Sequence, residues 1–248
     1  MRFKTIQASA FKATFEVMKD ILNDVNIYIS KTGFSIITLD TARVALVDIH
    51  MAAENFEEFE CDTPVYAGVN ISNMYKLLKM ISNNDILTLS ITSPEYLDIL
   101  IENNTRHANT KFRLKLLDID DERIEVPAIN MTIITTMPSS DFQRICRDMN
   151  NIANEITITR NSSEFEVSCE GDFAHQNTVI TCSDENTYDG CIRGTYSLKY
   201  LNLFTKATGM CSIIQIMQEA DNRFLVLKYN IANLGELKFY LATKIEDE

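Results

Sequence analysis

Pairs of basic side chains recur four times along a chain whose overall charge is strongly acidic. The formal net charge is −12 at pH 7 over 248 residues. The pairs are Lys12 and Lys19, Lys76 and Lys79, Arg144 and Arg147, and Lys199 and Lys206. Lysine and arginine neutralise phosphates without reading base edges, so the pattern predicts sequence-independent contact with a nucleic-acid backbone, weakened by salt. Because a pI near 4.8 argues against coating nucleic acid with the whole surface, this contact must be local.

Each pair lies in a segment with the spacing of an amphipathic helix, and the segments begin about 60 residues apart, near Ser9, Ser72, Ser140 and Ser197. Side chains at positions i, i+3, i+4 and i+7 predict one buried stripe per helix, with Thr14 as the one polar member. The stripes are Phe11, Thr14, Phe15 and Met18; Met74, Leu77, Leu78 and Ile81; Phe142, Ile145, Cys146 and Met149; and Tyr200, Leu203, Phe204 and Ala207. One such helix would indicate only a solvated basic face, whereas four repeats in an acidic chain favour a positive surface.

Two strands with alternating apolar residues follow each helical segment. They contain Val25, Ile27, Ile29, then Phe34, Ile36; Leu87, Leu89, Ile91, then Leu97, Ile99, Ile101; Ile156, Ile158, then Phe165, Val167; and Ile214, Ile216, then Leu225, Leu227. The repeated unit is therefore helix, strand, turn, strand. Alternation with short turns predicts antiparallel sheets with one covered face, and helices on that face give an α+β fold.

The four units group as two domains, which we place at residues 1–115 and 133–248. Between them, residues 116–132 contain an acidic run closed by a proline and lack a helical stripe, which predicts an extended connector. The acidic run could also be a metal site. A calcium loop that starts at Asp118 needs glycine and glutamate at two positions where this chain has Arg123 and Ile129. A solvated linker is therefore the favoured interpretation.

The rest of the sequence offers no catalytic constellation. Three histidines are dispersed without the spacing of metal ligands, and six cysteines include no C-x-x-C pair, which fits a reducing, intracellular compartment. Glycine-rich phosphate loops and nucleophile motifs are lacking. No apolar run is long enough to cross a membrane, and the N-terminus lacks the apolar core of a signal peptide. We therefore expect no enzyme activity, no metal, no cofactor and no membrane partner.

Several segments carry a specific family resemblance. They are residues 68–71 with 76–79, residues 137–139 with Phe142 and 144–148, residues 200–202 with 204–208, and the C-terminus 237–248. Through these residues the chain closely resembles, from residue 1 to 248, the proliferating cell nuclear antigen family of DNA sliding clamps. The resemblance implies a DNA-clamp fold in which two similar domains, each an antiparallel sheet with two helices, assemble into a closed homotrimeric ring. Self-assembly with cyclic symmetry is also expected because a channel for duplex DNA needs more helices than one chain offers.

The resemblance further implies a processivity factor that encircles duplex DNA, holds a DNA polymerase, recruits repair proteins and is opened by a clamp loader. The basic pairs would face DNA, and residues 116–132 would be the interdomain connecting loop. Subunits would pair strand 107–115 with strand 174–182 of a neighbour, and the interface would include Phe112, Leu114, Met149 and Ile152. The pocket for partner peptides would comprise Leu39, Arg43, Val44, Ile124, Val126, Pro127, Phe224, Tyr240, Leu241 and Ala242. The location would be nuclear, or the site of viral DNA replication if the source is a large DNA virus.

Two other interpretations stay open: a subunit of a heterotrimeric checkpoint clamp with the same fold, and a metal-dependent nuclease that uses the acidic connector. The chain also departs from the family pattern. Thr243 replaces a common proline, which predicts a looser pocket rim, and Arg43 stands where a histidine is common. Ser162 occupies the position of the loop lysine that receives ubiquitin, so that modification is in doubt, and Ala13 replaces a frequent lysine of the first helix.

Overall fold

A computed structural model describes residues 1–120, 124, 126, 131–182, 188, 190–221 and 223–244. The chain divides into two compact units. The first unit comprises Met1–Thr41, Val47–Glu125 and Asn230–Leu237, and the second comprises Ala42–Leu46, Val126–Tyr229 and Lys238–Glu248. Each unit therefore takes one short segment from the other half of the sequence.

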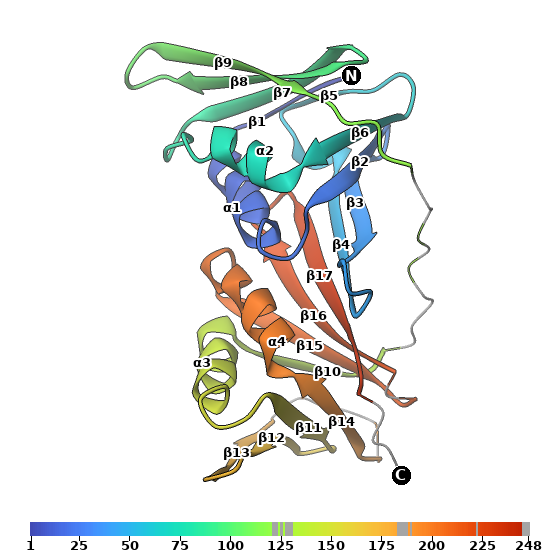
Figure 1. Cartoon of the computed structure of the whole chain (residues 1–248). Helices are drawn as coiled ribbons and strands as arrows, with labels where there is room; N and C mark the ends of the chain where they lie inside the picture. The colour runs from blue at the N-terminus through green and yellow to red at the C-terminus, as the bar shows by residue number, and fades with distance from the viewer. Residues whose placement is uncertain are drawn as a thin grey trace. The chain divides into compact units, whose positions relative to one another are not determined.

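The elements follow one another in a repeated order (Figure 1). Residues up to 115 form β1 (Arg2–Thr5), α1 (Ala8–Met18), β2 (Asp24–Ser30), β3 (Gly33–Leu39), β4 (Ala45–Ala52), the 3₁₀ turn η1 (Ala53–Asn55), β5 (Glu58–Glu60), β6 (Val65–Asn70), α2 (Ile71–Leu78), β7 (Ile86–Ser93), β8 (Tyr96–Asn103) and β9 (Ala108–Lys115). Residues from 131 form β10 (Met131–Pro138), α3 (Ser139–Met149), β11 (Glu155–Arg160), β12 (Glu164–Glu170), β13 (His175–Thr181), β14 (Ile192–Ser197), α4 (Leu198–Phe204), the 3₁₀ turn η2 (Thr205–Gly209), β15 (Ile213–Glu219), β16 (Phe224–Ile231) and β17 (Gly235–Ala242).

The repeats within a unit exchange their first strands. In the first unit, β1 precedes α1 but pairs with β7, which follows α2, while β6 precedes α2 but pairs with β2, which follows α1. The second unit repeats the exchange, because β14 pairs with β11 and β10 pairs with β15. All four pairings are antiparallel. Neither repeat of a unit can therefore complete its sheet without the other.

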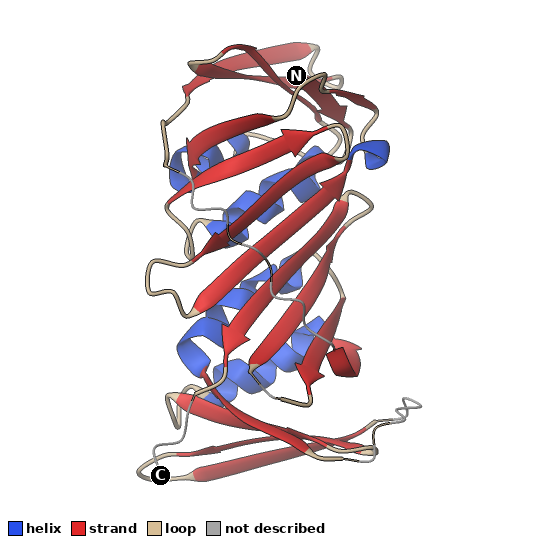
Figure 2. Ribbon diagram, turned by 90° about the vertical axis from the view of Figure 1, so that its right-hand side faces the viewer, coloured by secondary structure: helices blue, strands red, loops and turns tan. Residues whose placement is uncertain are grey.

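The helices begin within one residue of the predicted starts, and within each unit they lie against one face of the strands (Figure 2). The α2 helix shows how the sequence sets such a start. The Asn70 side chain accepts a hydrogen bond from the Asn73 N–H at 2.9 Å, which satisfies an otherwise free amide of the first turn. Ile71, Met74 and Leu78 then face the core. No described helix is long and apolar enough to cross a membrane.

The apolar stripes are confirmed for α1 and α3, but the predicted stripe of the last helix is right only for Phe204 and Ala207. Tyr200 and Leu203 are only half-buried. The structure instead buries Leu198, Leu201, Phe204 and Ala207, a row with a spacing of three. The regular helix is only seven residues long and ends at Phe204, and the 3₁₀ turn that follows, with about three residues per turn, puts Ala207 in line with Phe204. Leu77 of the second stripe is also half-buried.

The alternating strands are confirmed in β2, β3, β8, β11 and β12, where the predicted apolar residues are buried. In β7 the alternation ends early: Leu87 and Leu89 are buried, but Ile91 is only half-buried. The register between β7 and β8 shifts between Ser90 and Ser93, so the side chains after Ser90 no longer follow the inward alternation.

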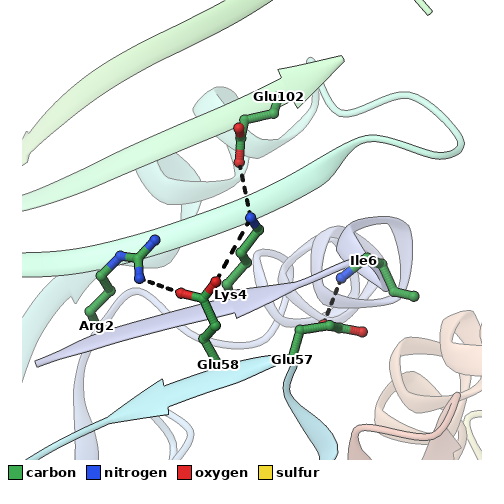
Figure 3. Close-up of polar contacts among 6 residues, drawn as sticks. All are labelled: Arg2, Lys4, Ile6, Glu57, Glu58 and Glu102. Atoms are coloured by element: carbon green, nitrogen blue, oxygen red, sulfur yellow. Dashed lines mark hydrogen bonds and ion pairs between the residues drawn. The ribbon is translucent and has the colours of Figure 1, made fainter. Parts of the chain in front are cut away.

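The first unit also contains an ion-pair network around β1 (Figure 3). Glu58 pairs with Arg2 and, at 3.9 Å, with Lys4, whose ammonium is 3.7 Å from Glu102. The Ile6 N–H donates to the Glu57 carboxylate at 2.9 Å. These side chains are partly exposed, so water screens each pair and the network serves to align β5, β1 and β8 more than to stabilise the unit.

Candidate nucleic-acid interface and binding edges

Two exposed lysines lie at the end of α2: Lys76 in its last turn and Lys79 directly after it. The Lys76 ammonium donates to the Asn73 side chain at 3.2 Å. Within the part of the chain that the structure describes, no carboxylate lies within ion-pair distance of either lysine. Their positive charge is therefore available to a negatively charged ligand in solvent.

Lys12 of α1 and Lys19, directly after this helix, are already engaged within the first unit. The Lys12 ammonium donates to the Ile81 carbonyl at 2.7 Å, just after α2, and is half-buried. Lys19 is 3.3 Å from Asp20 and lies over the Tyr75 ring at 5.3 Å from its centroid. Lys12 therefore joins the two helices as well as carrying charge, which the spacing of basic residues did not reveal.

A carboxylate also joins α1 to α2. The Tyr75 hydroxyl donates to the Glu16 carboxylate at 2.8 Å. This hydrogen bond, followed by burial, raises the pKa of Tyr75 above its ordinary value of 10.0. Glu16 is exposed, so it places a negative charge on the same helix as Lys12 and Lys19 and reduces the attraction of α1 for phosphates.

In the second unit, both arginines of α3 have acidic neighbours. Arg144 lies 3.5 Å from Asp141, and Arg147 lies 3.5 Å from Asp148. The arginine side chains are 63% and 69% exposed, so these ion pairs are weak and open to competition from an external anion. The α3 helix therefore carries cations whose field is partly cancelled.

Lys199 of α4 and Lys206 of η2 are exposed on the last helical segment. The Lys199 ammonium is 5.8 Å from the Tyr200 ring, which is within the range of a cation–π contact. No described carboxylate is within ion-pair distance of Lys199. Each unit thus combines one helix whose basic residues have acidic neighbours, α1 or α3, with one helix that carries a lysine without a described carboxylate partner, Lys76 of α2 or Lys199 of α4.

Each unit also has a sheet that ends in an exposed edge strand. β9 is the outermost strand of the sheet β5-β1-β7-β8-β9, and β13 is the outermost strand of the sheet β13-β12-β11-β14. An edge strand presents backbone N–H and C=O groups that can pair with another chain. Phe112 and Leu114 of β9 and Ile152 after α3 are half-buried, so part of each side chain is accessible.

Met149 is the exception among the expected interface residues. Its exposed fraction is 0%, because it lies on the buried stripe of α3 inside the second unit. The expectation that it contacts a neighbouring subunit is therefore wrong for the chain as folded. The same stripe had already predicted Met149 to be a core residue.

Basic residues on one edge strand and acidic residues beside the other edge are a feature that side-chain spacing did not predict. The outer face of β9 exposes Lys111, Arg113 and Lys115. The corresponding face of β12, next to β13, carries Glu164, Glu166 and Glu170. Arg113 Nε also donates to Asp98 at 2.8 Å, and this hydrogen bond lowers the pKa of Asp98. Alternation of charge along each strand was the signal that could have shown these faces.

Seven of the ten expected pocket residues lie in the second unit at positions that the structure describes, and five of them gather around the end of β17 and the segments next to it. The Ala242 N–H donates to the Val44 carbonyl at 3.3 Å, which joins the end of β17 to the segment before β4. Leu241 and Tyr240 are buried, Val44 is 37% exposed, and Phe224 is half-buried.

The remaining pocket residues are distributed differently. Arg43, also in the second unit, has a positive φ of 57°. Val126 belongs to the same unit and is half-buried, whereas Leu39 and Ile124 belong to the first. Pro127 and most of the connector after Asp120 lie outside the described residues.

Thr243 ties down the end of β17 in a way that a proline could not. Its N–H donates to the Arg223 carbonyl at 3.0 Å, and its side chain shares a hydrogen bond with the buried Tyr196. Proline has no N–H to donate. The exchange of proline for Thr243 therefore adds a hydrogen bond at this rim, which argues against the expected loosening.

Paired repeats of helices and antiparallel strands, with basic side chains on the helices, define the DNA-clamp class of folds. The N-terminal domain of proliferating cell nuclear antigen matches residues 1–123, and its C-terminal domain matches residues 125–244. The chain therefore belongs to the proliferating cell nuclear antigen family. It is also 36% identical over 253 aligned positions to the "Probable DNA polymerase sliding clamp 1" of Paramecium bursaria Chlorella virus 1, which covers 96% of this chain and 95% of that protein.

Proposed function

We propose that the chain is a DNA sliding clamp, a processivity factor for DNA polymerase that closes as a ring of three copies around duplex DNA. The observation that carries the proposal is the set of exposed lysines on α2, α4 and η2 in a protein of net charge −12. Membership of the family and the name of the viral relative support it. The chain holds a polymerase at the primer end and performs no catalysis itself.

The mechanism is topological. A closed ring cannot leave DNA sideways, so it does not need tight binding to stay on its substrate. Lysine contacts to phosphates carry no sequence information and exchange readily along the backbone, which leaves the ring free to slide. The acidic remainder of the surface limits non-specific sticking elsewhere on DNA. Because the sequence has no nucleotide-binding motif, opening the ring requires a separate ATP-driven loader.

Assembly joins β9 of one copy to β13 of the next as antiparallel neighbours. Phe112 and Leu114 then pack near Ile152 of the neighbour, while Met149 supports Ile152 from inside the core. The lysines and arginine of β9 then lie one strand beyond β13 from the glutamates of β12, and the attraction across β13 favours this pairing of edges. Three identical heterologous joints close the ring.

Partners bind through a short peptide whose aliphatic and aromatic residues fill a pocket at the end of β17. Val44, Phe224 and Ala242 form its accessible apolar surface, and the buried Tyr240 and Leu241 hold that surface in place. DNA polymerase, the clamp loader and repair proteins compete for this surface. The protein works where DNA is replicated, in the nucleus or at a viral replication site.

Polymerase stimulation tests the proposal. With a clamp loader and ATP, the protein should lengthen the products of a matched polymerase on a primed circular template. On a short linear template, a clamp can slide off the ends and the gain should be small. Equal stimulation on both templates would contradict topological retention.

The mass in solution separates this proposal from a checkpoint-clamp subunit. A homotrimer sediments near three times 28.3 kDa, whereas a subunit that requires two different partners remains near 28.3 kDa alone. Cleavage of DNA with magnesium that is lost on Asp118→Ala with Asp120→Ala would instead favour the nuclease alternative, which uses the acidic connector.

A further inference from the structure

We propose that Tyr75 of α2 is a positioning residue that keeps Lys19 available to the DNA backbone. Its ring carries the lysine, and its hydroxyl engages the carboxylate of Glu16, which would otherwise pair with that lysine. The inference rests on the proposed function, because it concerns how one cation beside the helices meets DNA. The contacts that carry it lie within the first unit.

Two polar contacts fix Tyr75 beside α1. The two helices lie side by side (Figure 1), and the Tyr75 hydroxyl donates to the Glu16 carboxylate at 2.8 Å. The Lys12 ammonium donates to the Ile81 carbonyl at 2.7 Å, so it ties α1 to the segment after α2. The hydrogen bond to Glu16 raises the pKa of Tyr75 above its ordinary value of 10.0, so the hydroxyl remains a donor at neutral pH.

One helical turn separates Glu16 from each of two lysines. Glu16 follows Lys12 by four residues and precedes Lys19 by three, and these are the spacings at which charged side chains meet on one helix face. Lys19 lies directly after α1 but keeps helical backbone angles, φ −59° and ψ −21°, so the spacing still applies to it. Within the described chain, however, Glu16 forms an ion pair with neither lysine, and its carboxylate accepts from Tyr75 instead.

The ring of Tyr75 carries Lys19. The Lys19 ammonium is 5.3 Å from the ring centroid, which is within the range of a cation–π contact. It is also 3.3 Å from Asp20, but these two side chains are 29% and 34% exposed, so water weakens the pair and a phosphate can replace it. A lysine that is already held in place loses less conformational freedom when it binds a ligand.

Loss of Tyr75 would bring Glu16 and Lys19 together. The carboxylate would lose its donor and the ammonium its ring, and Glu16 would then compete with phosphates for Lys19. One phosphate contact contributes about −0.9 to the slope of log K against log salt, so the slope should flatten by up to about 0.9 for each subunit in contact with DNA. Between about 50 and 200 mM salt, this change alters the affinity ratio about 3.5-fold.

A double-mutant cycle between Tyr75→Leu and Glu16→Gln tests the proposal in the full-length protein. The assay is fluorescence anisotropy of a labelled duplex at several salt concentrations. Tyr75→Leu should flatten the slope by up to about 0.9. Glu16→Gln keeps the side-chain shape without the charge, so it should restore the slope in the Tyr75→Leu background and change it little when Tyr75 is present. Repulsion between Glu16 and phosphates is common to both backgrounds and cancels in the cycle.

Two further variants serve as controls. Tyr66→Leu replaces a tyrosine that is 46% exposed and whose ring packs on Tyr28, with centroids 4.9 Å apart, so it should leave the slope unchanged. Tyr75→Phe keeps the ring and removes the hydroxyl, so it should flatten the slope less than Tyr75→Leu, and Glu16→Gln should again restore it. If Tyr75→Leu does not melt cooperatively, Tyr75→Phe carries the cycle.

The outcomes separate this proposal from the proposed function. Equal effects of Glu16→Gln in both backgrounds, or a wild-type slope for Tyr75→Leu, would overturn the positioning role. A loss of affinity in Tyr75→Phe that Glu16→Gln does not reverse would also overturn it, because the hydroxyl would then contact phosphate directly. If Lys76→Ala with Lys79→Ala keeps the wild-type slope, the helices do not face DNA and both proposals fail. If that variant flattens the slope while the cycle shows no coupling, only the role of Tyr75 fails.

Discussion

Neutralising two acidic side chains of α3 should strengthen DNA binding, although neither residue was expected to contact DNA. Asp141 and Asp148 each lie 3.5 Å from an arginine, and all four side chains are at least 48% exposed. Such exposed ion pairs contribute only about 0.2 to 1 kcal/mol each, so the arginines separate from them readily. The carboxylates nevertheless repel phosphates. Replacing both with asparagine preserves side-chain shape and frees Arg144 and Arg147.

The salt dependence of binding gives the magnitude. Each phosphate that a protein neutralises adds about −0.9 to the slope of log K against log salt. The Asp141→Asn, Asp148→Asn variant should therefore steepen the slope by up to about 1.8 for each subunit in contact with DNA. Lys76→Ala with Lys79→Ala, which removes exposed lysines, should flatten the slope by a similar amount. Between about 50 and 200 mM salt, a change of 1.8 in slope alters the affinity ratio about twelvefold.

Fluorescence anisotropy with a labelled duplex at several salt concentrations provides the assay. Asp141 lies in the first turn of α3, where a negative charge stabilises the helix by about 0.3 to 1 kcal/mol, so thermal melting must show that the asparagine variant remains folded. Sedimentation must show unchanged assembly for both variants. If the asparagine variant keeps the wild-type slope while the lysine variant flattens it, the acidic residues do not restrain the arginines. If neither changes, the helices are not the DNA-facing surface.

Three further predictions concern stability and assembly. Phe3 is 1% exposed and its ring centroid is 5.0 Å from that of Phe56, so Phe3→Ala should lower the free energy of unfolding in urea by about 3 to 5 kcal/mol. Phe173 is 77% exposed, so Phe173→Ala should lower it by less than about 0.5 kcal/mol, and equal losses would contradict the assigned core. The Arg113 hydrogen bond holds the pKa of Asp98 below its unfolded value of 3.8. The pair therefore stabilises the fold above that pH, and its contribution disappears as the pH falls through the folded pKa. Arg113→Ala should reduce the loss of unfolding free energy on acidification, and an unchanged pH profile would refute the pairing. Phe112→Ala should shift the sedimenting species toward the single-chain mass of 28.3 kDa, whereas the volume-conserving Met149→Leu should leave the mass unchanged. A Phe112→Ala protein that remains trimeric would argue against β9 as the edge that joins the subunits.

Side-chain spacing within a segment predicted those helices and strands that bury one face. The helix starts and most alternating strands follow from side-chain spacing because one face of each element is buried. The prediction missed the strands that precede the helices, such as β1 and β6. Their partners, β7 and β2, belong to the other repeat, and periodicity within a segment does not indicate which distant strand it pairs with. Half of the α4 stripe was wrong: Leu198 and Leu201 are buried in place of Tyr200 and Leu203, because several apolar residues in this short helix leave more than one row open to the pattern.

At the candidate site, too, the sequence predicted which side chains are exposed but not which contacts they make. Spacing placed Lys76 and Lys79 on an exposed helix face, as the structure has them. It could not show that Lys12 donates to the Ile81 carbonyl, because that contact depends on how α1 packs beside α2. The buried Met149 illustrates the opposite error: the amphipathic pattern placed it in the core, and the family resemblance assigned it to an interface.

The exchange of first strands between repeats has a consequence for the protein as it emerges from the ribosome. Arg2 pairs with Ser90, 88 positions later, so at synthesis rates of about 5 to 20 residues per second β1 waits roughly 4 to 18 s for β7. During that interval β5, which pairs Phe3 with Phe59, is the one neighbour in its sheet that β1 can reach. β10 faces a comparable delay, since Pro138 pairs with Ile213. Nascent chains of this protein should therefore engage chaperones twice, once for each unit, and releasing them early would favour aggregation over slow folding.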